Sequence, residues 1–71
     1  MSRMVVALKS ILDEFDYMGK EDLPTVCEGE VFAKIGTITR AYIETQEDGT
    51  ARLIAIAALA LKGLERYGQL G

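Results

Sequence analysis

Carboxylates are the most abundant of the side chains in this sequence that could do chemistry. The chain has no histidine and one cysteine, so the Ser-His and Cys-His pairs that activate nucleophiles cannot form. Within the densest acidic stretch, 13–22, Asp13 and Asp16 are spaced so that one helix face could hold a hard cation such as Mg²⁺. The same spacing is more typical of a solvated helix face, with Asp16 paired weakly to Lys20. We therefore predict no catalytic residue, no metal site and no cofactor.

The other candidate groups have structural explanations. Cys27 would lie near the start of a helix, where a thiolate is favoured, but a lone cysteine more often packs as a small apolar residue. Glu28 and Glu30 are two apart and so point to different sides of a helix, which is poor metal-binding geometry. Tyr42 and Tyr67 fit core or interface positions better than the role of a catalytic phenol.

Length and composition predict a single small globular domain, residues 1–71. The chain is 49% hydrophobic with a net charge of -3, whereas disorder requires low hydrophobicity and high net charge. A domain of this size buries only about 60% of the surface that its unfolded chain exposes. Small folds compensate with disulfides, a metal or association. One cysteine and no histidine argue against the first two, so we expect a homo-oligomer.

The charge pattern and the apolar runs exclude two kinds of partner. The basic residues are scattered singly rather than clustered, which predicts no nucleic-acid binding: Arg3, Lys9, Lys20, Lys34, Arg40, Arg52, Lys62 and Arg66. The longest apolar run, 53–61, is shorter than the roughly 20 residues of a membrane span. Lys9 and Asp13 interrupt the apolar start that a secretory signal would need. We predict no membrane association and a cytoplasmic protein with Cys27 reduced.

The first predicted helix covers about residues 4–18. Ser2 can cap its start and Gly19 can end it. Its apolar residues recur at the spacing of one helical stripe: Met4, Val5, Leu8, Ile11, Leu12, Phe15 and Met18.

A second helix is predicted over about 26–46, after a connection at 20–24. Thr25 to Glu28 matches a capping box, and the following apolar residues are spaced by threes and fours. Gly29 and Gly36 each cost about 1 kcal/mol in a helix, however. An alternative is a β-hairpin over 35–56 that turns at 47–50, and residues 42–57 then loosely resemble the strand-turn-strand of hotdog-fold thioesterases.

The third predicted helix, about 51–67, is rich in alanine, the strongest helix former. Asp48 or Thr50 can cap it and Gly68 can end it. Its middle is apolar nearly all round, so more than one side should be buried, and in a three-helix chain the extra side needs a partner. The expected interface residues are Leu53, Ile56, Ala57, Ala60, Leu64 and Tyr67.

Two stretches, AKIGTITRAYIE at 33–44 and RLIAIAALA at 52–60, resemble the helical core of MazG-like nucleotide pyrophosphohydrolases. The resemblance implies an all-α oligomer; that family hydrolyses nucleoside triphosphates to monophosphate and pyrophosphate with Mg²⁺ held by carboxylates on two helices. In the ungapped register those carboxylates fall on residues that are not acidic: Ala33, Lys34, Thr37, Arg52 and Ala55. The resemblance therefore implies the scaffold without the metal site.

Together these features predict an all-α, three-helix domain packed into a homo-oligomer. The leading hypothesis is a non-enzymatic accessory or regulatory module that acts through protein–protein contacts, with its own copies or with another protein. Two alternatives stay open: a MazG-like pyrophosphohydrolase or nucleotide binder that uses other carboxylates, and a small α+β domain with a hotdog-like hairpin.

Overall fold

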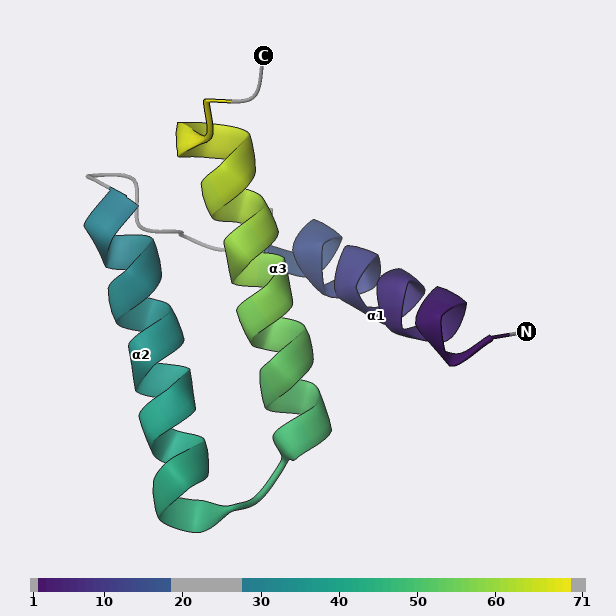
Figure 1. Ribbon diagram of the computed structural model, residues 1–71, viewed down its shortest axis with the longest axis vertical. Helices are drawn as coiled ribbons and strands as arrows, with labels where there is room; N and C mark the ends of the chain where they lie inside the picture. The colour runs from purple at the N-terminus through teal and green to yellow at the C-terminus, as the bar shows by residue number, and fades with distance from the viewer. Residues whose placement is uncertain (1, 19–27, 70–71) are drawn as a thin grey trace.

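A computed structural model of the chain describes residues 2–18 and 28–69 (Figure 1). These residues form three helices, α1 (Arg3–Met18), α2 (Glu28–Thr45) and α3 (Gly49–Tyr67), and contain no strand. The all-α prediction is confirmed. The predictions made for residues 19–27, which include the Gly19 cap, the connection, the capping box and the Cys27 environment, lie outside the described residues.

The start of α1 has the predicted cap. The Val5 amide donates a hydrogen bond to the Ser2 hydroxyl oxygen at 3.2 Å, and the Val6 amide donates to the Ser2 carbonyl at 3.3 Å. Ser2 thereby satisfies one of the amides that a helix leaves without an intrahelical acceptor. The helix begins one residue earlier than the spacing predicts and ends at Met18 as predicted.

The two predicted strands of the alternative β-hairpin, 35–43 and 51–56, lie in α2 and α3, so the hotdog-like alternative is wrong. The β-branched threonines of α2 fit the helix because their hydroxyls donate to carbonyls four residues earlier, Thr37 to Ala33 at 3.1 Å and Thr39 to Ile35 at 2.8 Å. Val31 is buried, with Ile35 and Ile38 half-buried along the same side of the helix. Burial of this stripe outweighs the cost of two glycines.

The start of α3 differs from the prediction. Asp48 occupies the N-cap position in the left-handed region, with φ 58°, and its side chain makes no capping hydrogen bond. Asp48 therefore takes the predicted N-cap position without the capping hydrogen bond, whereas Thr50 lies inside the helix and does not cap it. The backbone carbonyl of Asp48 accepts from the Arg52 amide, and the Glu47 carbonyl accepts from Arg52 Nε, both at 2.9 Å. The turn is therefore stabilised by hydrogen bonds from Arg52.

Gly68 follows the last residue of α3, as the sequence predicts. Its amide donates to the Leu64 carbonyl at 2.9 Å, while its backbone is extended, with φ -68° and ψ 144°. A Cβ at this position would collide with the Leu64 carbonyl oxygen. Glycine is thus required for close approach rather than for left-handed backbone.

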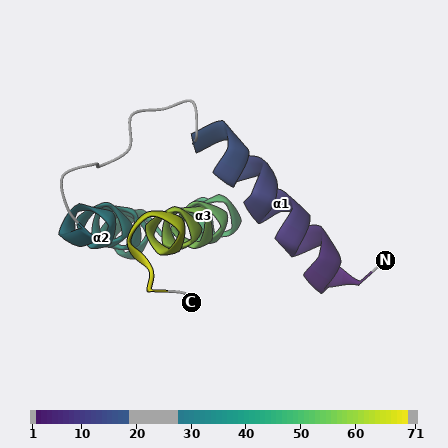
Figure 2. The same ribbon diagram turned by 90° about the horizontal axis from the view of Figure 1, so that it is seen from above.

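The central element of the fold is α3. It lies antiparallel beside α2, and α1 crosses it on the side away from α2, as Figures 1 and 2 show together. Both α1 and α2 contact α3, but they do not contact each other. Among the described residues only Val31, Ala58 and Leu59 are buried. The three helices therefore form an open arrangement rather than a closed three-helix bundle.

Candidate functional site

The six residues predicted to form an interface lie along one stretch of α3. Leu53, Ala60 and Leu64 are exposed, with 68% of Leu53 and 49% of Leu64 accessible to solvent. Ile56 and Ala57 are half-buried. These five residues recur at helical spacing, so they share one side of the helix. The structure thus leaves the predicted side of α3 largely uncovered by α1 and α2.

Tyr67, the sixth predicted residue, differs from the others. It is half-buried, and its hydroxyl is buried without a hydrogen-bond partner among the described residues. Because its hydroxyl is buried, Tyr67 is oriented toward the protein rather than toward solvent. A buried phenol without a hydrogen-bond partner costs free energy. Its position at the end of α3 still places it next to the exposed side chains.

Two hollows lie between α2 and α3. One, of about 260 Å³, is lined by Thr39, Tyr42, Gly49, Arg52, Leu53 and Ile56. The other, of about 250 Å³, is lined by Val31, Phe32, Ile35, Ala60, Gly63 and Leu64, with Glu28 and Gly68. Because the lining residues of each helix follow one another at helical spacing, both hollows open on the same side of the α2–α3 pair.

These hollows are parts of one continuous apolar surface. We call it the α2–α3 surface, and it consists of Phe32, Ile35, Thr39 and Tyr42 from α2 with Leu53, Ile56, Ala60 and Leu64 from α3. Phe32 is the most exposed of the α2 members, at 66%. Phe32 is not among the predicted interface residues, although its helical spacing from Ile35, Thr39 and Tyr42 could have revealed it.

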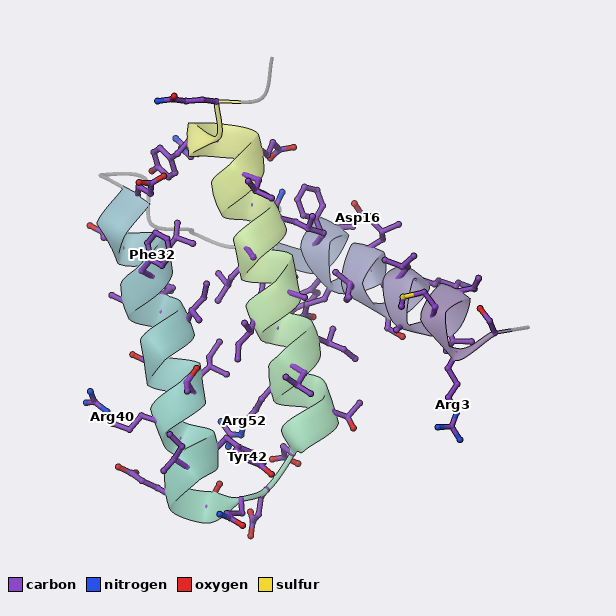
Figure 3. All side chains as sticks on the ribbon, viewed as in Figure 1. Arg3, Asp16, Phe32, Arg40, Tyr42 and Arg52 are labelled. Carbon is purple, nitrogen blue, oxygen red and sulfur yellow. The ribbon has the colours of Figure 1, made fainter. Side chains whose placement is uncertain are left out.

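Charged groups are confined to the two ends of this surface. Glu28 lines the hollow at the start of α2, and Arg52 lines the hollow near the turn. Arg40 points away from α3, as Figure 3 shows, and Tyr42 and Arg52 lie together near the turn. Neither Glu28 nor Arg52 has an ion-pair partner within 2–18 and 28–69, where the ion pair present joins Lys62 and Glu65 at 3.8 Å.

A third hollow, of about 470 Å³, lies where α1 crosses α3. Its apolar lining includes Val6, Ala7 and Ile11 from α1 and Leu53 and Ile54 from α3. Leu53 therefore belongs to the rim of both the α1 crossing and the α2–α3 surface. The large apolar side chain of Leu53 thus connects the α2–α3 surface with the apolar hollow at the α1 crossing.

The carboxylates are not gathered into a site. Asp13 and Asp16 are exposed on α1, and Figure 3 shows Asp16 on the outside of the molecule. No group of three or more Asp, Glu, Cys or His side chains in the described part of the chain is arranged to hold a metal ion. Glu28 and Glu30 are both on the first turn of α2, and of these two Glu28 lines the hollow that contains Leu64, whereas Glu30 lines none of the three hollows described above.

Comparisons with known proteins found no matching family model, no matching curated protein and no matching solved structure. None of the three described helices is long and apolar enough to cross a membrane. The α2–α3 surface, described above from its own residues, is the best-supported candidate for a functional site.

Proposed function

We propose that this chain is a small non-enzymatic module that acts through protein–protein contact, first with further copies of itself. The observation that carries the proposal is the apolar α2–α3 surface, to which Phe32, Leu53 and Leu64 each contribute a large exposed side chain. Exposed apolar patches rimmed by polar residues mark interaction sites in soluble proteins.

The exposed area supports the same proposal. The chain has an accessible surface of 5530 Å², whereas a folded monomer of 7.8 kDa is expected to expose about 4,400 Å². The excess, about 1,100 Å², is a property of the whole chain, which buries less of its surface than a typical monomer of its mass. With only three described side chains buried, association would also supply burial that the single chain lacks.

Light scattering coupled to size exclusion tests the proposal. At a chain concentration of about 100 µM, well above typical dissociation constants of obligate small oligomers, we expect a mass at least twice the 7.8 kDa of the single chain. A strict monomer at this concentration would contradict the proposal. Leu53→Lys should shift the mass toward the monomer, because it replaces a large exposed apolar side chain of the surface with a charge beside Arg52.

A matched control separates this effect from a general effect of charge. Tyr17 on α1 is 60% exposed and lines neither the α2–α3 surface nor the α1 crossing. Tyr17→Lys adds the same charge to an exposed apolar site, and we expect it to keep the wild-type mass. Equal loss of assembly in both variants would remove the α2–α3 surface from the proposal.

A further inference from the structure

The exposed side of α3 carries a self-complementary seam. Leu53, Ala57, Ala60 and Leu64 follow one another at intervals of four, three and four, which is the spacing of a coiled-coil seam. In size they run large, small, small, large, so the order is the same in both directions. Reversing one copy against another places each leucine against a leucine and each alanine against an alanine.

We infer that a second copy of this chain packs on the α2–α3 surface in antiparallel orientation, with α3 against α3 and α2 against α2. The two-fold axis runs between the two copies of α3, at right angles to both, level with the midpoint between Ala57 and Ala60. This inference rests on the proposed function, since it names the partner and its orientation. The alanines at the centre allow the helices to approach closely, and Leu53 of each copy faces Leu64 of the other.

The charges at the ends of the surface favour this orientation. Arg52 lines the same hollow as Leu53, and Glu28 lines the same hollow as Leu64. Pairing Leu53 with the second copy's Leu64 therefore brings Arg52 toward the second copy's Glu28, and the symmetry repeats this pair at the other end. Arg52 is held in position because its Nε donates to the Glu47 carbonyl at 2.9 Å. Opposite charges that meet on docking fix register and direction.

The other face-to-face two-fold arrangement lacks this complementarity. An axis parallel to the helices would place α3 over the second copy's α2, with Arg52 over Thr39 and Tyr42 and no carboxylate lining that hollow. The single chain exposes about 1,100 Å² more than is expected for its mass, so a second copy would supply burial that it lacks. Two helices from each copy would then enclose one four-helix core.

Cysteine cross-linking distinguishes the two orientations. Three variants are made with Cys27 replaced, C27S/L53C, C27S/L64C and C27S/Y17C, and oxidised alone and in pairwise mixtures. Within one chain positions 53 and 64 are about 16 Å apart along the helix, whereas disulfide-bonded Cα atoms lie within about 7 Å. Tyr17→Cys measures collisional cross-linking, because Tyr17 is exposed on α1 away from the seam.

The inference predicts that the mixture of the 53 and 64 variants gives at least tenfold more covalent dimer than either variant alone or any mixture with the 17 variant. Dimers of the 53 variant with itself in excess of the mixed dimer would overturn the antiparallel orientation. Cross-linking at the level of the 17 variant, with light scattering still reporting an oligomer, would overturn it and leave the proposed function standing. A monomer by light scattering would overturn both.

Discussion

Helices α2 and α1 both pack on α3, but α2 approaches it more closely than α1 does. At the α2–α3 contact the backbone of α3 lies close to side chains of α2: a Cβ built on Gly63 would lie 3.2 Å from Val31 Cγ1, and one on Gly49 would lie 3.2 Å from Tyr42 Cε1. The crossing helix α1 contributes no buried residue. The difference indicates that α2 packs more tightly on α3 than α1 does, although both helices contact α3 over a similar extent.

The polar contacts differ in the same sense. The α2–α3 turn is held by two hydrogen bonds from Arg52, one of them from its backbone amide. At the α1 crossing the described polar contact is between side chains, with Lys62 Nζ 3.8 Å from the centroid of the Phe15 ring. A single cation–π contact is worth about 0.5–1 kcal/mol at an exposed site. We therefore expect substitutions at the two contacts to change the free energy of unfolding by different amounts.

The largest effect is expected at Leu59. This side chain is 3% exposed on α3, and Leu59→Ala should lower the free energy of unfolding by about 2–5 kcal/mol, from lost burial and the cavity left behind. Ile11→Ala, at a half-buried position of α1, should cost less than half as much. Urea unfolding followed by circular dichroism measures both. Equal losses would show that α1 is as well integrated as the α2–α3 pair.

A smaller change in stability is expected when either of two glycines in α2 and α3, Gly36 and Gly63, is replaced by alanine. Gly36 has no atom within 4 Å of a built Cβ, so Gly36→Ala should stabilise the fold by up to about 1 kcal/mol through helix propensity. Gly63→Ala gains the same propensity but presses on Val31, so it should be neutral or destabilising. Thermal unfolding of the two variants compares them directly. A gain at Gly63 equal to that at Gly36 would mean that the α2–α3 contact is looser than the 3.2 Å approach implies.

The parts of the fold that depend on local sequence could be predicted, whereas those that depend on contacts between distant residues could not. The helices follow from local properties: apolar spacing in α1, alanine content in α3, and the Ser2 and Gly68 boundaries. For α2 the glycines and β-branched residues left a β-hairpin open, and what decides it is packing of Val31 and Ile35 toward α3, a contact between distant parts of the chain. Local propensity yields to such contacts.

The candidate site shows the same division. An apolar surface all round α3 predicts that some side is left over, and Leu53, Ala60 and Leu64 are indeed exposed. Periodicity places Phe32 on one side of α2 with the other α2 members of the α2–α3 surface, but it does not say which neighbour covers which side, so the separate crossing of α1 could not be derived. The left-handed Asp48 also escapes prediction, because the backbone of the turn, rather than a capping side chain, supplies the acceptor.

The smallest effect is expected at the α1 crossing itself. Lys62→Met keeps most of the apolar stem but removes the cation above Phe15 and the ion pair with Glu65, so stability should fall by about 0.5–1 kcal/mol. Lys34→Met removes the same charge from an exposed site on α2 and is the control. Hydrogen exchange sharpens the test, because loss of the contact should raise exchange in α1 more than in α2 and α3. If α1 and α2 lose protection equally in Lys62→Met, the three helices unfold as one unit and the contrast between the two contacts does not hold.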